Sequence, residues 1–400
     1  MTIVPARHAA AADETRRHAL ILGAGIAGCS LAERLAARGW QIDLIDAADG
    51  PGAGASGNHA GVLRPLPSLD DNRMSRLTRA GTLYGWQTIE RLRREGFAPR
   101  AEACGVLHLA RDAAQESKMR KVADTLALPP EQLRYVSASE ATTIAGCAVR
   151  NGGWWFAGSG WVQPPSLCRA LLASADAHAR APLRPHFGAH VERIDFSSGR
   201  WQACTADGRL IAAAPTLILA AGTGITQFPA AAPLPIASAR GQVSLLPAAP
   251  DSPPRVVVCC GGYVSPAIDG LRCAGATFTV NDPDPNVRPA DHEENLRTLD
   301  KMLPGAGTGF DPAQLGGRVG FRPASPDRLP IVGAIDHARR LFALSGFGAR
   351  GLVWSMLVAE HLACVLEGEP SPLTHDLAEA IDPARFASRP PRADRTPSPE

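Results

Sequence analysis

The amino-acid sequence predicts an α/β fold, in which a Rossmann-type dinucleotide-binding domain is interleaved with an antiparallel β-sheet domain of α+β character. Three observations support this prediction: a strand, glycine turn and helix near the start, alternating strand patterns in the second half, and an apolar helix near the end. At 400 residues the chain is long for one compact domain, so two joined lobes that share a cleft are expected.

The first element is a βαβ unit within the stretch "ALILGAGIAGCSLAERLAARGWQIDLID". Hydrophobic periodicity predicts a strand over residues 18–22, a helix over 27–38 and a second strand over 41–46. Such a unit is one half of a doubly wound sheet.

A glycine-rich turn joins the first strand to the helix. Gly23, Gly25 and Gly28 form G-x-G-x-x-G in the strand-to-helix context that raises this pattern above a chance match. Gly23 allows the tight turn, Gly25 lets the backbone approach a pyrophosphate, and Gly28 lets the helix pack closely on the strand. Asp46, at the end of the second strand, is placed to accept hydrogen bonds from a ribose. A dinucleotide site is therefore predicted here.

The middle of the chain is polar and helical. Helices are predicted over about 72–95, 113–126 and 139–145, the last with a serine at a capping position, and they are interpreted as an insertion. From residue 189 the pattern changes to strands, "HVERIDF", "RWQACTA" and the apolar "PTLILAAG". The last of these should return to the nucleotide-binding sheet.

A second β region follows, with the segments "GQVSLLP", "RVVVCCG" and "YVSPAIDGLRCAGATF". Asp269-Gly270 between alternating segments is typical of a tight hairpin. Near the end, "LFALSG" predicts a strand, and "GLVWSMLVAEHLACVLEG" predicts a mostly buried helix that stops at Gly368 and Pro370. The polar, proline-rich tail after Pro383 is expected to be disordered.

The composition indicates a folded protein, because 45% of the residues are hydrophobic and 20% are charged. Nine cysteines are scattered without a C-x-x-C pair, which favours a reducing cytoplasm and predicts no metal site. The adjacent Cys259 and Cys260 are interpreted as small buried residues rather than a redox couple. Neither a signal peptide nor an apolar run of bilayer length is present, so no membrane association is expected.

The net charge of +2 neither requires nor excludes a polyanionic partner. One region, from Arg64 to Arg100, is locally basic and contains arginines at positions 73, 76, 79, 91, 93 and 94. Two interpretations stay open for this region. It is either a solvated helix face, which is more common, or a surface that contacts the phosphates of a nucleic acid.

FAD and NAD share the glycine fingerprint, so two later segments must distinguish them. "GAGASGNHAG", shortly after Asp46, is a second glycine-rich loop whose exposed backbone N–H groups suit a further phosphate and the ribityl chain of a flavin. "LILAAGTGI" is a strand that runs into a turn of small residues, which allows a second close backbone approach to the same cofactor. FAD is therefore the predicted cofactor.

The order of these motifs resembles the D-amino-acid-oxidase-like (DAO) flavoprotein superfamily, which includes glycine oxidases. It continues with "RGQVS", "RVGFRPASPDRLPIVG" and "SGFGARGLVWS". Within the superfamily, "GASGNHAGVLRPLPSLDDN", "GGWWFAGSGWVQPPSLCRALL" and "DHEENL" are most similar to the FAD-dependent oxidoreductase domain of bifunctional tRNA 5-methylaminomethyl-2-thiouridine biosynthesis proteins. The methyltransferase domain of those proteins has no counterpart in the first eighteen residues, so only the oxidase half is expected.

The resemblance, together with the glycine motifs, implies a set of FAD-binding residues spread over the chain. They are Gly23, Gly25, Ile26, Ala27, Gly28, Asp46, Ala55, Ser56, Asn58, Gly61, Val191, Ala221, Gly222, Gly348, Arg350, Gly351 and Leu352. Many members of the superfamily have "GHG" where this chain has "GFG" at residues 346–348, so no role of that histidine is carried over.

The resemblance also implies the reaction: FAD removes a hydride from the carbon beside the nitrogen of a carboxymethylaminomethyl wobble uridine in tRNA, and water releases glyoxylate. Arg322 corresponds to the arginine that binds the substrate carboxylate in glycine-oxidase-like relatives, and an arginine fork suits a carboxylate. Its alternative role is an ion pair with an internal acid such as Asp327. Tyr263 resembles an assisting tyrosine, although a tyrosine that caps the core is nearly as plausible. Arg240 and Gln242 are assigned to the cleft.

Three hypotheses for function stay open. The first is the tRNA-modifying oxidase, with a separate methyltransferase as a further partner acting on its product. The second is an FAD-dependent oxidase of a free small amino acid such as glycine, sarcosine or a D-amino acid. The third is a flavin-stabilised tRNA-binding protein without turnover. The three lysines, at positions 118, 121 and 301, lie in no cofactor motif, so the electron acceptor is not predicted.

The expected domain organisation is one oxidoreductase unit of two interleaved lobes over residues 18–400. The predicted segments are a flexible N-terminus over 1–17, an FAD-binding lobe over about 18–70, 150–230 and 320–382, a substrate lobe over about 71–149 and 231–319, and a disordered tail over 383–400.

Overall fold

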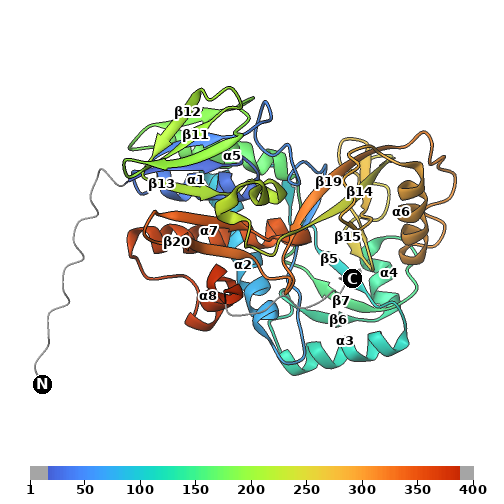
Figure 1. Cartoon of the computed structure of the whole chain (residues 1–400). Helices are drawn as coiled ribbons and strands as arrows, with labels where there is room; N and C mark the ends of the chain where they lie inside the picture. Colours follow the sequence, from blue (N-terminus) through green and yellow to red (C-terminus); the bar gives the residue numbers. More distant parts are fainter. Residues whose placement is uncertain (1–16, 388–400) are drawn as a thin grey trace, which may run out of the picture.

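The computed structural model describes residues 17–387 and consists of two lobes that lie side by side (Figure 1). The first lobe contains a six-stranded sheet in the order β20-β21-β13-β1-β2-β9. Its strands are β1 (His18–Leu22), β2 (Gln41–Ile45), β9 (Leu183–His186), β13 (Thr216–Leu219), β20 (Ile331–Asp336) and β21 (Leu341–Ser345). All neighbours are parallel except β20 and β21. This is the predicted doubly wound sheet, and the segment 216–219 returns to it.

Both faces of this sheet are covered, as a parallel sheet requires. Helices α1 (Ile26–Ala36), α2 (Arg73–Arg94), α5 (Pro164–Ala177) and α7 (Gly351–Glu367) share one buried core. A three-stranded sheet of β10 (Arg193–Ser197), β11 (Arg200–Cys204) and β12 (Leu210–Ala214) contributes to a second core. Within β1, Ala19 and Ile21 belong to the helical core, and Leu20 and Leu22 to the other. Side chains thus alternate between the faces.

The second lobe contains a nine-stranded sheet in the order β18-β14-β17-β16-β15-β5-β7-β6, with β19 also paired to β14. Its strands are β5 (Val106–Leu109), β6 (Arg134–Val136), β7 (Gly153–Phe156), β14 (Ala237–Pro247), β15 (Val257–Cys259), β16 (Tyr263–Val264), β17 (Leu271–Gly275), β18 (Thr279–Val280) and β19 (Gly316–Ala324). Only the pair β15–β5 is parallel. The antiparallel second lobe is therefore confirmed.

Short elements complete the two lobes. Helices α3 (Ala113–Leu126), α4 (Ala138–Ala145) and α6 (Pro289–Met302) belong to the second lobe (Figure 1). The remaining elements are the small sheet β3 (Gly61–Leu63), β4 (Ala101–Glu102) and β8 (Gly160–Val162), helix α8 (His375–Ile381), and the 3-10 turns η2 (Gly222–Gln227), η3 (Pro229–Ala231), η4 (Gly348–Arg350) and η5 (Pro383–Phe386). No sequence pattern predicted β12 or the small sheet.

Local signals explain where several elements begin and end. Ser137 and Glu140 form a capping box at the start of α4, and Gly368 ends α7 with φ +69°. In the predicted hairpin, Asp269 and Gly270 have φ values of +52° and +76°, as a two-residue turn between twisted strands requires. These predictions are confirmed.

The predicted boundaries need several corrections. Helix α2 packs into the core of the first lobe, although residues 71–149 were predicted to belong to the substrate lobe. Strand β7 belongs to the second sheet although residues from 150 were assigned to the FAD-binding lobe, and β19 crosses the expected boundary at 320. Residues 383–387 of the expected disordered tail are folded: Pro383 is buried in η5, and Arg385 Nε donates to Asp327 Oδ2 at 2.8 Å. Arg17, expected in a flexible segment, pairs with Glu367 at 2.6 Å. The rest of both predicted segments lies outside the described residues.

All nine cysteines are free in the structure. Among the described residues, one helical stretch, Gly348–Glu367, is long and apolar enough to cross a bilayer. It contains α7, which packs on α1 and α2, and most of its apolar part is buried within the protein, as in the core helix of a globular fold.

Candidate functional site

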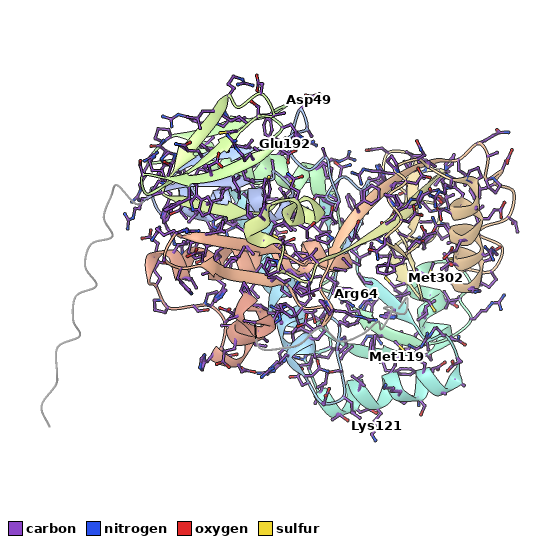
Figure 2. The ribbon with its side chains drawn as sticks, in the orientation of Figure 1. Asp49, Arg64, Met119, Lys121, Glu192 and Met302 are labelled. Carbon is purple, nitrogen blue, oxygen red and sulfur yellow. The ribbon has the colours of Figure 1, made fainter. Side chains whose placement is uncertain are left out.

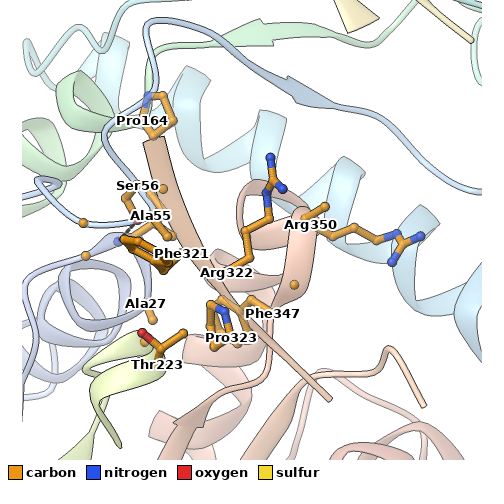
Figure 3. Close-up of a pocket in the computed structure, with 18 of the residues that line it drawn as sticks. Ala27, Ala55, Ser56, Pro164, Thr223, Phe321, Arg322, Pro323, Phe347 and Arg350 are labelled. Carbon is orange, nitrogen blue, oxygen red and sulfur yellow. Dashed lines mark hydrogen bonds between the residues drawn. The ribbon is translucent and has the colours of Figure 1, made fainter. Parts of the chain in front are cut away.

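A cavity of about 850 Å³ lies where the two lobes meet. Its walls come from the first glycine turn, the loop after β2, the turn after β13, strand β19 and the start of α7 (Figure 3). It also reaches residues of the second sheet, including His108 and Tyr263. The cofactor motifs and two of the expected substrate-site residues, Arg322 and Tyr263, thus border one continuous space.

The structure brings nearly all predicted cofactor residues to this cavity. Those in its wall are Gly23, Gly25, Ile26, Ala27, Asp46, Ala55, Ser56, Asn58, Gly61, Val191, Ala221, Gly222, Gly348, Arg350, Gly351 and Leu352. Gly28 lies behind the wall within α1. A β-carbon at Gly28 would collide with the carbonyl of Gly23, so this glycine has the packing role that its spacing predicts.

The first turn is shaped to admit a dinucleotide backbone. Gly23 has φ +107°, and a β-carbon there would lie 2.5 Å from the carbonyl oxygen of Ala220. Helix α1 begins after Gly25, which has no side chain to cap it, and Gly25, Ile26 and Ala27 at this N-terminus line the cavity. These features suit a pyrophosphate at the helix N-terminus.

Asp46 and Ser56 hold the surrounding loops. Asp46 accepts hydrogen bonds from the backbone N–H of Ala24 at 2.6 Å and of Ala48 at 2.9 Å, which fixes its carboxylate at the cavity wall. Ser56 Oγ accepts from the N–H of Ile26 at 3.0 Å and so joins the second glycine loop to the start of α1. Each Asp46 oxygen keeps a lone pair that a ribose hydroxyl could use.

Arg322 lies in the cavity wall on β19, and Figure 3 shows it and Phe321 leaving the strand on opposite sides. Its Nη1 donates to the carbonyl of Thr277 at 3.3 Å. Burial lowers the pKa of Arg322, although a guanidinium stays charged near neutral pH. The alternative ion pair with Asp327 is excluded because Asp327 binds Arg385 instead. The described residues give Arg322 no carboxylate partner.

Tyr263 also lines the cavity, but its hydroxyl is already engaged. The hydroxyl donates to the carbonyl of Ala60 at 2.6 Å and lies 3.1 Å from Cys273 Sγ. Burial raises the pKa of Tyr263 well above its ordinary value, and the nearby Cys273 acts in the same direction. The hydroxyl contacts agree with a tyrosine that caps the core, and its place in the cavity wall leaves the substrate-assisting role a prediction.

Arg240 and Gln242 do not line the cavity, so their assignment to the cleft is corrected. Both are fully buried on β14 and face α6. Arg240 pairs with Asp291 at 2.6 Å and donates to the carbonyl of Asn286 at 2.6 Å. Gln242 bonds the backbone of Arg288 through both its amide atoms, at 2.7 and 2.8 Å. Gly241, between them, is the residue that lies against the guanidinium of Arg322.

Sequence reasoning missed several residues of the cavity wall. They are Arg64, His108, Arg318, Phe321 and Phe347. Figure 2 labels Arg64 near the junction of the two lobes. Burial lowers the pKa of His108 well below its ordinary value, so this imidazole is neutral near pH 7. The spacing of Arg318 and Arg322 on one strand was an available signal, because residues four apart share a strand face.

The basic region between Arg64 and Arg100 is largely neutralised within the chain. Its ion pairs are Arg76–Asp376, Arg79–Asp71, Arg91–Glu33, Arg93–Glu90 and Arg100–Asp269. Apart from Arg91–Glu33, in which Glu33 is buried, these are pairs at the surface, which contribute little stability. These pairs also neutralise positive charge that a surface for binding phosphates would need. The solvated-face interpretation is therefore favoured for most of these arginines.

The residues present fit a dinucleotide flavin. The turn at Gly23, the N-terminus of α1 and the carboxylate of Asp46 would hold the adenosine and pyrophosphate part, and the loop at residues 53–58 would lie beside the rest. No group of three or more potential metal ligands occurs in the part of the chain that the structure describes, and none was predicted.

Comparisons with known proteins agree with this geometry. Residues 18–365 match the DAO family, described as FAD dependent oxidoreductase. A protein of Azoarcus sp. (strain BH72) is 62% identical over 402 residues, which cover 96% of this chain and 62% of that protein. One of Aromatoleum aromaticum is 54% identical over 404 residues, with coverage of 97% and 62%. Both are named tRNA 5-methylaminomethyl-2-thiouridine biosynthesis bifunctional protein MnmC, and the chain spans less than two-thirds of their length.

Solved structures match over nearly their whole length. Iminodiacetate oxidase from Chelativorans sp. BNC1 has a TM-score of 0.74 at 28% identity, with 91% of this chain and 98% of that one covered. Glycine oxidase from Bacillus cereus has a TM-score of 0.75 at 19% identity, with 90% and 97% covered, and supports the fold alone. The predicted resemblance, fold class and FAD cofactor are confirmed by these matches.

Proposed function

The chain belongs to the DAO family of FAD-dependent oxidoreductases, and we propose that it removes the carboxymethyl group from 5-carboxymethylaminomethyl-(2-thio)uridine at the tRNA wobble position. The products are 5-aminomethyl-(2-thio)uridine and glyoxylate. The names of the two relatives at 62% and 54% identity support this class of substrate. Iminodiacetate, on which the 28% identical oxidase acts by its name, carries the same carboxymethylamino group.

One observation carries the proposal: Arg322 presents a guanidinium without a carboxylate partner among the described residues, in the cavity that the FAD-binding turn also borders. A carboxylate is the natural ligand of such a fork, because two parallel hydrogen bonds fix its orientation. When bound, FAD supplies the acceptor for the hydride that leaves the carbon beside the nitrogen. The amine thereby becomes an iminium ion, which water cleaves to glyoxylate and the protonated aminomethyl-uridine.

The residues of the chain would position the substrate for this step. Arg322 would hold the carboxylate, which places the adjacent carbon at a fixed distance from the cofactor-binding wall. Phe321, Phe347 and the ring of Tyr263 line the same cavity and would limit the access of water. His108, neutral near pH 7, would leave the substrate amine free of charge repulsion. None of the three lysines borders the cavity.

The proposed product is a primary amine, and the relatives' name specifies a methylaminomethyl group. The two differ by one methyl group, so a methyltransferase must act after this reaction, either as a separate protein or as a joined domain. The nine free cysteines fit the reducing cytoplasm, which is where we place the enzyme.

The test measures the anaerobic reduction of the bound flavin, which is monitored as a decrease in the visible absorbance of the flavin. We expect tRNA that carries carboxymethylaminomethyl-uridine to reduce the flavin at least about tenfold faster than glycine, sarcosine or iminodiacetate at equal concentration. The rate should fall steeply between about 50 and about 200 mM salt if several phosphates are contacted. Rapid, salt-insensitive reduction by a free amino acid would establish the small-molecule oxidase instead. Binding of tRNA without reduction would establish a non-catalytic role.

A further inference from the structure

Arg318 lies in the cavity wall on β19, four residues before Arg322, and has no place in the function described so far. The two arginines share one face of the strand, with Gly320 between them, because side chains alternate. Because Gly320 has no side chain, Arg318 and the backbone of Ala55 can lie close to it. A β-carbon at this position would be 3.3 Å from Arg318 Nη1 and 3.6 Å from the Cα atom of Ala55.

The guanidinium of Arg318 binds the loop at residues 53–58. Its Nη2 donates to the carbonyls of Ala53 and Gly54, and its Nη1 to Asn58 Oδ1 at 3.4 Å. It lies against the backbone of Gly57, where a β-carbon would be 2.6 Å from Nε. Burial lowers the pKa of Arg318. The described residues supply no carboxylate to it, so it binds the loop through neutral acceptors.

Few other interactions fix the conformation of this loop. Gly54 and Gly57 raise the entropic cost of ordering it, and one internal backbone hydrogen bond, from the N–H of Gly57 to the carbonyl of Gly54, closes it at 3.0 Å. The loop nevertheless carries Ser56, which binds the first N–H of helix α1. The contacts of Arg318 therefore extend from β19 through the loop to the N-terminus of α1.

We propose that Arg318 is a positioning residue that fastens the cofactor-binding loop 53–58 to the strand that carries Arg322. It makes the flavin-binding wall and the substrate-binding wall parts of one rigid unit. Removing its side chain frees the loop, weakens FAD binding and allows the flavin to shift relative to the substrate carboxylate. The proposal depends on FAD as the cofactor and not on the identity of the substrate.

The first experiment compares Arg318→Met and Arg318→Lys with the parent protein. The dissociation constant of FAD is measured by titration of the apoprotein, and we expect it to rise at least about tenfold for Arg318→Met. The rise should be smaller for Arg318→Lys, because a lysine ammonium can still bind some of the loop oxygens that the guanidinium binds. Hydrogen exchange should accelerate in residues 53–58 and not in α6. Arg209→Met, on an exposed turn remote from the cavity, is the charge-matched control.

A second pair of variants tests the same contact from the loop. Gly57→Ala should displace the guanidinium and reproduce the loss of FAD affinity with Arg318 still present, whereas Gly50→Ala, with nothing within 4 Å of the added carbon, should bind FAD like the parent. Unchanged FAD affinity and unchanged exchange in Arg318→Met overturn the proposal. A raised KM with normal FAD affinity also overturns it, because Arg318 would then bind the substrate directly. The FAD titration and the hydrogen-exchange measurement are both made without substrate, so their results are independent of the tRNA assay.

Discussion

The guanidinium of Arg322 lies against the backbone of Gly241 on the neighbouring strand, where a β-carbon would come within 2.5 Å of its Cζ atom. The two strands are paired in register there, with Gly241 opposite Gly320 and Ala239 opposite Arg322. The absence of a side chain at Gly241 creates the space in which the guanidinium lies. The position of the proposed carboxylate-binding group thus depends on a residue that contacts no substrate.

Gly241→Ala should therefore damage substrate binding without touching a charged group. The added methyl group has to displace the guanidinium, so we expect KM for the tRNA substrate to rise at least about tenfold while the visible spectrum of bound FAD stays normal. Gly316→Ala on β19 is the matched control, because its β-carbon would make only an ordinary contact with Leu245 at 3.9 Å. Equal KM values in the two variants would mean that Arg322 does not bind substrate from its observed position.

Arg322→Lys retains the charge but removes the planar fork. A lysine ammonium cannot reproduce a bidentate contact, so kcat/KM should fall about tenfold or more, which corresponds to about 1.4 kcal/mol or more of lost transition-state stabilisation. Arg297→Lys, on an exposed part of α6, should leave the rate unchanged. Stopped-flow measurement of flavin reduction gives the rates of both variants. A rate for Arg322→Lys equal to that of the parent would remove Arg322 from the substrate site.

The cofactor half of the site was predictable from the sequence because it depends on local backbone geometry. The turn at Gly23 and the packing of Gly28 on it require glycine at fixed spacing, whatever the rest of the chain does. The hairpin at Asp269 and the end of α7 at Gly368 follow from the same local rule, since each needs a positive φ. The prediction succeeded where a few consecutive residues determine the conformation.

The substrate half depends on which face of a strand points to the cavity, and the sequence does not reveal this. Arg240 and Gln242 bind residues of α6 and the segment before it, whereas Gly241 between them lies against Arg322. Arg318 was missed because its partners are backbone carbonyls some 260 positions earlier in the chain. The fold of residues 383–387 depends on a similarly distant contact, between Arg385 and Asp327.

Asp46→Ala should weaken the binding of FAD. The substitution removes the charged acceptor proposed for a ribose hydroxyl and leaves the N–H groups of Ala24 and Ala48 without their present partner, at a cost of about 1.5–3 kcal/mol. Titration of the apoprotein with FAD measures the loss. Asp49→Ala, an exposed carboxylate three positions later and outside the cavity wall, is the control. If Asp46→Ala binds FAD like this control, Asp46 has no role in the site.

Asp43 links three strands at the outer edge of the cofactor-binding sheet. It accepts hydrogen bonds from His18 Nε2 and His186 Nε2, each at 2.7 Å, and its side chain is only 6% exposed. Burial raises the pKa of Asp43, but the hydrogen bonds from the two histidines outweigh it, so its pKa lies below the ordinary value. A carboxyl group of this kind stabilises the folded state only while it is ionised.

The direction of the pKa shift of Asp43 gives a prediction for the pH dependence of stability. The stabilisation is fully present above the carboxyl pKa of the unfolded chain, about 4, and is lost as the pH falls through the lower pKa of the folded state. Asp43→Asn should therefore lower the free energy of unfolding by about 1–3 kcal/mol at pH 7 and by much less near pH 3. Urea denaturation at several pH values measures the difference. Glu379→Gln, which removes the partner of the exposed His375, should change stability by less than about 1 kcal/mol throughout. A difference between parent and Asp43→Asn that stays constant down to pH 3 would show that the charge of Asp43 is not what joins these strands.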